Sequence, residues 1–203
     1  WPHRHLVDRI SRNHFFDQYA IKLSGTKIYW CDGNHENHDD LQERVAAAPV
    51  GPIEIPVRGC FYMPRGSILV LPDGRNVLFF GGAMSTDKDG RVEGDSWWAA
   101  EVPTQEDLDY ARAQVAAHGG RVDIVISHTG PLTFLRQLPA KEIDPGRLED
   151  PTVALLDSIL KEFQPRRWYF GHFHLDAKGV DQGCEWQALS GEGLGGKWWV
   201  ELV

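Results

Sequence analysis

Three predicted strands that each end in a polar block constrain this chain most strongly. Residues 27–31, 122–127 and 167–170 are short aromatic and β-branched runs with the length and composition of buried strands. The polar blocks that follow them are Asn34-His35, Ser127-His128 and Gly171-His172. The carboxyl ends of parallel strands meet at one edge of an α/β sheet. The pattern therefore predicts that an amide and several imidazoles gather at a single site.

The remaining periodicity predicts an α/β fold of two packed mixed β-sheets flanked by helices. Helices are expected at residues 10–21, 38–48, 104–117 and 152–163. Three strands at 59–63, 67–71 and 76–80, joined by proline and glycine turns, are expected to form an antiparallel meander. Further strands are expected at 177–180, 185–189 and 198–203. Without a repeat or a linker, the 203 residues predict a single domain spanning 1–203, with helices outside the two sheets.

Charge and cysteine content narrow the function classes. The net charge of −8, without any run of Lys or Arg, makes binding to long nucleic acids unfavourable. Cys31, Cys60 and Cys184 are an odd and well-separated set, which predicts free thiols in a reducing, cytoplasmic environment. No apolar stretch approaches the length of a membrane span, so no membrane association is expected.

The histidine spacing indicates a metal site. His172 and His174 are two residues apart, so in an extended segment their side chains would share a face and could bind neighbouring metals. Asn34 offers a neutral carbonyl oxygen, which suits a site that must also hold an anion. His3 and His5 form another possible ligand pair, but two solvated side chains near a chain end are the simpler interpretation. The loop at residues 81–94 is long enough to border the site.

These blocks, in this order, resemble a known superfamily. The sequences Gly33-Asn34-His35-Glu36, Ser127-His128 and Gly171-His172-Phe173-His174 are similar to the last three signature blocks of the calcineurin-like metallophosphoesterases. The segments 80–82 and 93–98 resemble small single-domain bacterial and phage members. The resemblance implies an α/β/β/α sandwich and hydrolysis of a phosphomonoester or phosphodiester.

The resemblance also implies roles for individual residues. Two divalent ions would bind, with Asn34, His128 and His172 as ligands of one and His174 as a ligand of the other. A hydroxide bridging the ions would attack phosphorus, His35 would be the general acid, and Asn34 and His35 would contact the substrate. Manganese is the first expectation for the metal, with iron, zinc and nickel as alternatives. The substrate would be a phosphorylated small molecule, a nucleotide or a phosphoprotein.

The chain also departs from the family pattern. The D-x-H and early G-D blocks, which supply most ligands of the first metal, are missing from the sequence. We expect the natural protein to extend upstream by a β-α-β unit, so that this chain is N-terminally truncated. The alternative is a non-catalytic phosphoesterase-like binding module with a degenerate metal site. A distant alternative is a metallo-β-lactamase-like hydrolase, because residues 172–176 resemble the start of that family's H-x-H-x-D-H motif.

Overall fold

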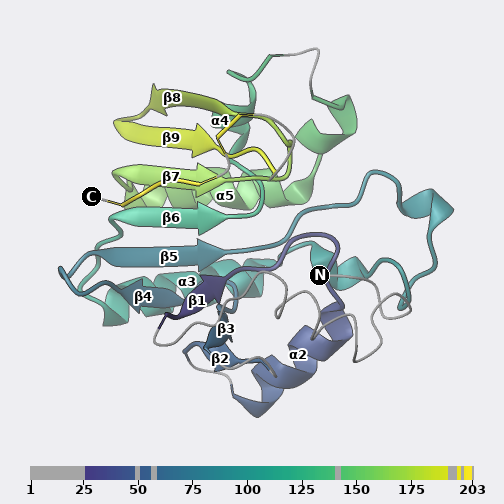
Figure 1. The fold of residues 1–203 in the computed structure, drawn as a ribbon, viewed down its shortest axis with the longest axis horizontal. Helices are drawn as coiled ribbons and strands as arrows, with labels where there is room; N and C mark the ends of the chain where they lie inside the picture. Colours follow the sequence, from purple (N-terminus) through teal and green to yellow (C-terminus); the bar gives the residue numbers. More distant parts are fainter. Residues whose placement is uncertain are drawn as a thin grey trace.

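The computed structural model describes residues 26–48, 51–55, 59–139, 143–191, 196–197 and 199–202. In these parts of the chain, two β-sheets are flanked by helices, which confirms the predicted fold class (Figure 1). The expected helix at 10–21 and the His3 and His5 pair lie outside the described residues. The single-domain organisation stays a prediction.

The larger sheet supplies the frame of the molecule. Its strand order is β4-β5-β6-β7-β9-β8. The strands are β4 (Ile68–Val70), β5 (Asn76–Phe80), β6 (Ile124–Ser127), β7 (Arg167–Phe170), β8 (Ala177–Asp181) and β9 (Cys184–Ala188). The inner strands β5, β6, β7 and β9 are parallel, and the edge strands β4 and β8 are antiparallel to their neighbours. The side chains that follow β6 and β7 therefore emerge at the same edge.

The smaller sheet corrects the predicted meander. β3 (Cys60–Tyr62) pairs in parallel with β1 (Ile28–Trp30) and antiparallel with β2 (Ile53–Glu54), whereas only β4 and β5 form the expected hairpin. Alternating hydrophobicity identifies a strand but not its partner, so the sequence order was misleading here. β2 lies in a proline-rich stretch for which no strand was predicted. The expected strand at 198–203 was also wrong, because residues 199–202 adopt no regular structure.

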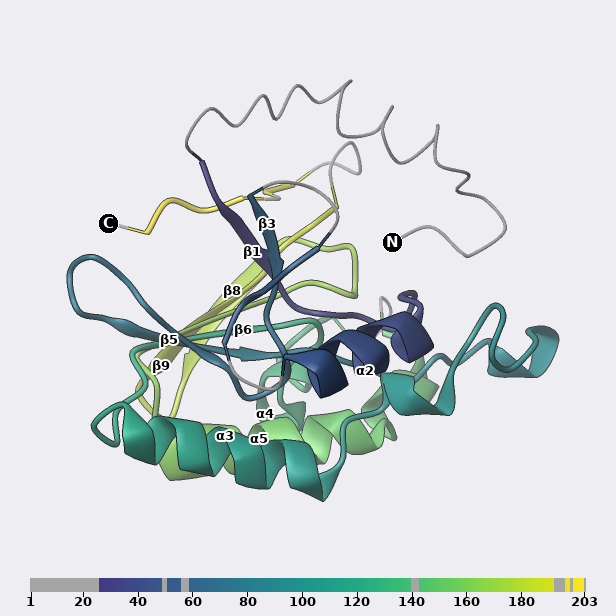
Figure 2. The same ribbon diagram turned by 90° about the horizontal axis from the view of Figure 1, so that it is seen from below.

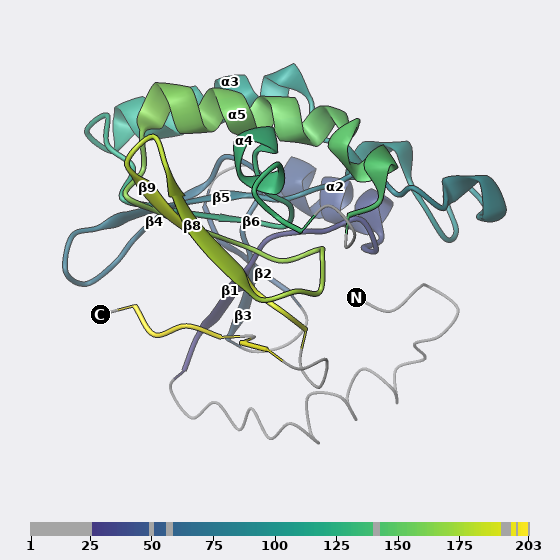
Figure 3. The ribbon, with the colours of Figure 1, turned by 90° about the horizontal axis from the view of Figure 1, so that it is seen from above.

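Helices cover one face of the larger sheet. Figures 2 and 3 show α3 (Gln105–Ala117), α4 (Leu132–Leu135) and α5 (Pro151–Phe163) on this face, with β1 and β3 on the other side. α3 begins with the predicted capping box, in which Thr104 and Asp107 each accept a hydrogen bond from the other's backbone N–H. α5 begins with the Asp150 side chain as its N-cap and ends at Gln164 in the left-handed conformation.

Both faces of the larger sheet are packed. On the helical face, Trp168 and Phe134 are fully buried and their rings pack edge to face. On the opposite face, Val77, Phe79 and Ile124 pack around Met63 from the segment after β3. Every residue of β5 is buried, as expected for a central strand covered on both sides.

The remaining helices complete the described structure. The helix expected at 38–48 is confirmed as α2 (His38–Ala47). It buries Leu41 against Ile53 and Tyr62 of the smaller sheet. Short 3-10 turns lie in the long connections: η1 (Lys88–Gly90), η2 (Ala99–Glu101) and η4 (Pro145–Leu148). None of the helices in the described ranges has both the length and the apolar character needed to cross a lipid bilayer.

Candidate metal centre

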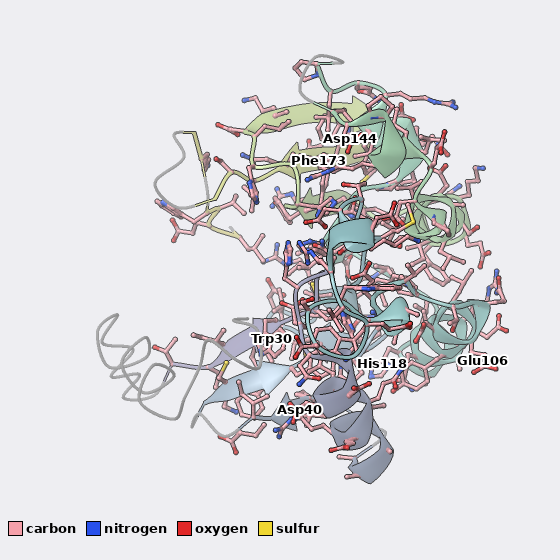
Figure 4. The ribbon with its side chains drawn as sticks, turned by 90° about the vertical axis from the view of Figure 1, so that its right-hand side faces the viewer. Trp30, Asp40, Glu106, His118, Asp144 and Phe173 are labelled. Atoms are coloured by element: carbon pink, nitrogen blue, oxygen red, sulfur yellow. The ribbon has the colours of Figure 1, made fainter. Side chains whose placement is uncertain are left out.

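The three predicted blocks meet where the strands of the larger sheet end. Asn34 follows β1, His128 follows β6 and His172 follows β7. Figure 4 looks onto the side toward which the parallel strands point, with Trp30 at the end of β1 below and Phe173, just beyond β7, above. The blocks come together as the sequence predicts, but from two sheets and not from the edge of one, because β1 belongs to the smaller sheet and β6 and β7 belong to the larger sheet.

Three polar side chains converge on one another. Nε2 of His128 is 3.1 Å from Oδ1 of Asn34 and 3.0 Å from Nδ1 of His172. The two imidazole rings meet edge to face, with centroids 4.8 Å apart. Residues separated by 94 and 44 positions along the chain are thus in direct contact. The site requires the tertiary fold and cannot form from local sequence alone.

Glycine is required where β1 reaches this site. A Cβ added at Gly33 would lie 2.6–2.8 Å from three atoms of the His128 ring, which is closer than carbon atoms pack. Both backbone polar groups of Gly33 have partners. The Gly33 N–H donates to Oε2 of Glu36 at 2.6 Å, and the Gly33 carbonyl lies 3.1 Å from Nε2 of His38. The Gly33 backbone is therefore fixed beside the imidazole of His128.

A buried ion pair anchors the residue just before this glycine. Asp32 is fully buried and accepts hydrogen bonds from Nε and Nη2 of Arg65 at 2.9 and 2.6 Å, and from the Tyr62 hydroxyl at 3.0 Å. Burial alone would raise the pKa of Asp32, but Arg65 and, to a lesser degree, His38 hold it below its usual range. Asp32 therefore remains a carboxylate and ties the end of β1 to the segment after β3.

The loop after β7 has an unusual backbone. His172 and His174 have φ angles of 67° and 55°, in the left-handed region that favours glycine. The Gly171 N–H donates to the carbonyl of His128 at 3.0 Å, and Nη1 of Arg147 donates to the carbonyl of His172 at 2.8 Å. These contacts hold the two histidines in conformations that a free chain would rarely adopt.

The ring nitrogens of the converging histidines are kept neutral. Burial, followed by the neighbouring His128 and Arg147, lowers the pKa of His172 to about 2. Burial also lowers the pKa of His128, and nearby Glu36 and Asp32 only partly oppose the effect. Neutral imidazole is the form that binds metals.

The converging atoms fit a divalent ion on their chemistry and spacing. When two ring nitrogens each lie about 2.1 Å from one ion and the two metal–nitrogen bonds are nearly perpendicular, the nitrogens lie roughly 3 Å apart. The nitrogens of His128 and His172 have this separation, and the Asn34 oxygen lies at a similar distance. Among the described residues, however, no three His, Cys, Asp or Glu side chains cluster closely enough to hold a metal. The ligand set found here is two imidazoles and an amide.

Among the described residues, no hydrogen bond or ring contact joins the His174 imidazole to these three side chains. His174 is exposed, and together with His172 and Ser190 it lines an adjacent cavity of about 250 Å³. It influences His172 electrostatically, because it contributes to lowering the pKa of that ring. The prediction that His174 binds a second, neighbouring metal stays a prediction.

His35 borders a polar cavity of about 240 Å³ beside the converging residues. Residues from the 81–94 loop line this cavity, as the sequence predicts, and Arg147 and His172 lie on its wall. Nδ1 of His35 is 3.1 Å from Nη1 of Arg91, which also pairs with Asp87. Because a guanidinium only donates hydrogen bonds, Nδ1 accepts here and the proton of the neutral ring lies on Nε2.

Four residues of the site were missed by sequence reasoning. Arg91 reaches the cavity from the residue after η1 and Arg147 from within η4, and an isolated arginine in or beside a single 3-10 turn gives no recognisable pattern in the sequence. Ser85 accepts a hydrogen bond from Nδ2 of Asn34 at 3.0 Å and donates to Oε2 of Glu101 at 2.9 Å. Only the length of the 81–94 loop pointed toward Ser85, and no local signal marked Glu101.

Fold and site together define a class of protein. It is an α/β protein whose parallel strands present neutral imidazoles and an amide oxygen, the donors of a divalent metal, at their carboxyl ends. A comparison with family models then identifies the chain: it belongs to the calcineurin-like phosphoesterase family, whose model matches residues 6–176. The resemblance found from the signature blocks is thereby confirmed. Members of this family generally hydrolyse phosphoester bonds and use divalent metals. A comparison with curated protein sequences gives no match.

Proposed function

We propose that this chain hydrolyses a phosphomonoester or phosphodiester with the help of divalent metal. The observation that supports this most directly is the convergence of Asn34, His128 and His172 beside the cavity that His35 and two arginines line. Bound divalent ions would supply Lewis-acid stabilisation and an activated water. Asn34, His128 and His172 would hold one ion, and His174 would contribute to a second. Manganese is the first candidate, and iron, zinc and nickel suit the same donors.

The cavity offers positive charge for a phosphorylated substrate. Arg147 donates to the His172 carbonyl through Nη1, and its guanidinium stacks over the Phe173 ring at 5.5 Å. Within the described parts of the chain, no carboxylate forms an ion pair with Arg147. Its charge is therefore available to a phosphoryl oxygen, which arginine binds well. We propose a phosphorylated small molecule, nucleotide or protein as the substrate.

His35 would protonate the leaving oxygen. In the contact with Arg91, the proton of the neutral ring lies on Nε2 and Nδ1 is occupied. An imidazolium carries hydrogens on both nitrogens, so its formation requires this contact to open. Arg91 keeps its ion pair with Asp87 when it leaves His35, which makes such an opening feasible.

The test compares three histidine variants by turnover and by metal content. With p-nitrophenyl phosphate or bis-p-nitrophenyl phosphate and manganese, His35→Ala should lower turnover by about 10²–10⁴-fold, the usual contribution of a general acid, while metal content is retained. His128→Ala should reduce the metal content itself, measured by elemental mass spectrometry. The control is His118→Ala, because His118 caps the end of α3 and its ring nitrogen Nδ1 contacts the Gln114 carbonyl of the same helix, whereas its carbonyl, which the substitution keeps, accepts from Asn76. Loss of metal in His35→Ala with retention in His128→Ala would contradict these roles.

One observation favours a second candidate, a non-catalytic module that binds a phosphorylated ligand. The described residues bring together only two imidazoles and one amide, fewer ligands than a binuclear centre needs. Saturable binding of inorganic phosphate without turnover of either nitrophenyl ester, with manganese present, would establish this alternative and exclude the esterase.

We also propose a cytoplasmic location. Cys31, Cys60 and Cys184 are all free thiols, and two of the three are buried. Unpaired cysteines are typical of a reducing compartment.

A further inference from the structure

We propose that Glu101 is a positioning residue that acts through Ser85 to set which end of the Asn34 amide faces His128. This inference rests on the metal centre of the proposed function, but not on the reaction catalysed there. It concerns two residues that carry no role in the metal chemistry itself. The contacts that connect them to Asn34 form a single chain of hydrogen bonds.

Ser85 is part of a rigid backbone segment. Four consecutive N–H groups donate to fixed acceptors: Gly82 to the Asp32 carbonyl at 2.9 Å, Ala83 to the Glu101 carbonyl at 3.1 Å, Met84 to the Asp150 carboxylate at 2.8 Å and Ser85 to the Glu101 carboxylate at 2.5 Å. The Ser85 side chain is buried, so solvent does not compete for its hydroxyl. Its position relative to Asn34 is therefore set by the fold.

The direction of the hydrogen bonds follows from Glu101. Burial raises the pKa of Glu101, and the two hydrogen bonds from Ser85 oppose this shift because they favour the carboxylate. The carboxylate only accepts: Oε1 from the Ser85 N–H at 2.5 Å and Oε2 from the Ser85 hydroxyl at 2.9 Å. The hydroxyl has one proton, and it is committed to Glu101. Toward Asn34 the hydroxyl can then only accept, so it must face the amide NH₂ group, Nδ2, at 3.0 Å. This leaves Oδ1 directed at Nε2 of His128, 3.1 Å away.

The orientation matters because the two ends of an amide differ in charge and not in size. Oδ1 can bind a cation, whereas the NH₂ group carries two hydrogens and repels one. A reversed Asn34 would occupy the same volume, so packing alone does not select the useful orientation. Hydrogen bonding makes the selection, as expected for groups that orient metal ligands from behind.

The placement of Glu101 supports a specific role. Its exposed fraction is 1%, and the described residues provide it with no ion pair. Burying a carboxylate without a cation is costly, so such a group requires compensation from hydrogen bonds. Its backbone carbonyl accepts from Nη2 of Arg65 at 3.0 Å, and this arginine also holds Asp32, two residues before Asn34. The Arg65 guanidinium therefore fixes both Glu101 and the backbone just before Asn34, the two ends of this chain of hydrogen bonds.

The variant Glu101→Gln tests this direction with almost no change in volume. The new amide oxygen must accept from the Ser85 N–H, which places the new NH₂ group at the Ser85 hydroxyl. That hydroxyl then accepts from the new side chain and donates toward Asn34. Asn34 must turn its oxygen to Ser85 and its NH₂ group to the histidines. We expect manganese binding, measured by calorimetry, to weaken by about 10–100-fold, as for other residues that orient ligands.

A rescue variant separates positioning from a general structural role. Asn34→Asp replaces the amide by a carboxylate, which has an oxygen at each end and no wrong orientation. In the Glu101→Gln background, Asn34→Asp should restore most of the manganese affinity, although Glu101 is still changed. The control is Glu106→Gln, which makes the same chemical change at an exposed residue in the first turn of α3, labelled in Figure 4, without contact to the site.

A second readout uses metal-free protein. Nuclear Overhauser contacts of the Asn34 side-chain NH₂ protons should point to Ser85 in the wild type and to the His128 ring in Glu101→Gln. If these contacts and the manganese affinity are both unchanged in Glu101→Gln, Glu101 does not set the orientation and the inference is wrong. A wild type that hydrolyses no phosphoester refutes the proposed function, while the orientation of Asn34 still decides this inference.

Discussion

Replacing Arg65 by methionine should destabilise the protein strongly, because it leaves the carboxylate of Asp32 buried without its cation. Asp32 has no exposed surface, and the side chain of Arg65 is 9% exposed. The substitution removes both hydrogen bonds that the guanidinium donates to Asp32, together with its hydrogen bonds to the carbonyls of Ala100 and Glu101. Only the Tyr62 hydroxyl, at 3.0 Å, is left as a side-chain donor to Asp32 among these residues. Methionine fills a similar volume, so the change is mainly electrostatic.

The magnitude follows from the burial of the pair. Breaking a buried ion pair by removing one partner typically costs about 3–5 kcal/mol. That loss is large against a total free energy of unfolding of about 5–15 kcal/mol for a natural protein. With a urea dependence of roughly 2–3 kcal/mol per molar, the unfolding midpoint should fall by about 1–2 M. The same loss should be absent from any exposed arginine–aspartate pair.

The cost should also depend on pH in a defined direction. In the wild type, Arg65 keeps the pKa of Asp32 below its ordinary value of 3.8, so this group contributes stability above that range and loses it as pH falls through the folded pKa. Without Arg65, burial raises the pKa of Asp32 above its unfolded value. The folded variant then binds a proton that the unfolded chain does not bind. The destabilisation should therefore shrink as pH falls from neutral toward about 5.

Urea denaturation of metal-free protein at these two pH values measures both effects. The control is Arg44→Met, since Arg44 and Asp40 form an exposed pair at 2.8 Å on α2, which should cost less than about 1 kcal/mol at either pH. Adding Asp32→Asn to Arg65→Met should recover part of the loss at neutral pH, because the unpaired charge is gone. If Arg65→Met costs no more than Arg44→Met, or if its cost is equal at the two pH values, the explanation from a buried charge fails.

Three smaller predictions concern the glycine, a cap and a ligand. Gly33→Ala should displace the His128 ring, which lies 2.6–2.8 Å from the added Cβ, and should lower the manganese affinity measured by calorimetry. It should also lower the free energy of unfolding, measured by urea denaturation, by about 1–3 kcal/mol. An unchanged manganese affinity would refute the close approach of Gly33 to His128. Thr104→Ala removes the N-cap of α3 and should cost about 1 kcal/mol without changing manganese binding. Burial lowers the pKa of His172 from its ordinary value of 6.5 to about 2 in the folded protein, so metal-free protein should lose stability as pH falls below 6.5. His172→Gln should flatten this dependence in denaturation curves between about pH 6.5 and 4.5, and an unchanged slope would assign it to other groups.

The parts of the fold that sequence could predict depend on local pattern. The buried runs of β6 and β7, the apolar face of α5 and the capping box of α3 are all encoded in neighbouring residues. Strand pairing is different, because β3 joins β1 across about 30 residues and no short-range signal selects that partner. The expected meander was wrong for this reason.

Some residues of the candidate site could likewise be predicted from local sequence pattern, and others could not. Asn34, His128 and His172 could be brought together from sequence because each lies within four residues of the carboxyl end of a strand, where α/β proteins place their sites. Ser85 and Glu101 could not, since Ser85 lies in a loop, Glu101 ends a single 3-10 turn, and their roles depend on burial and on a hydrogen bond between them. Hydrogen-bond direction is a property of the folded arrangement.

The left-handed backbone at His172 and His174 lowers the stability of the fold at two residues that we propose as metal ligands. With φ angles of 67° and 55°, each residue holds a conformation that costs a side-chain-bearing residue about 1–2 kcal/mol relative to glycine. Glycine at His174, which is exposed, would relieve this strain and lose little packing. Selection for heat resistance alone would therefore replace histidine with glycine here, and the imidazoles would be lost as the protein became harder to unfold. A population of variants ranked by melting temperature in the absence of metal should accordingly place those that carry glycine at position 174 above the parent chain.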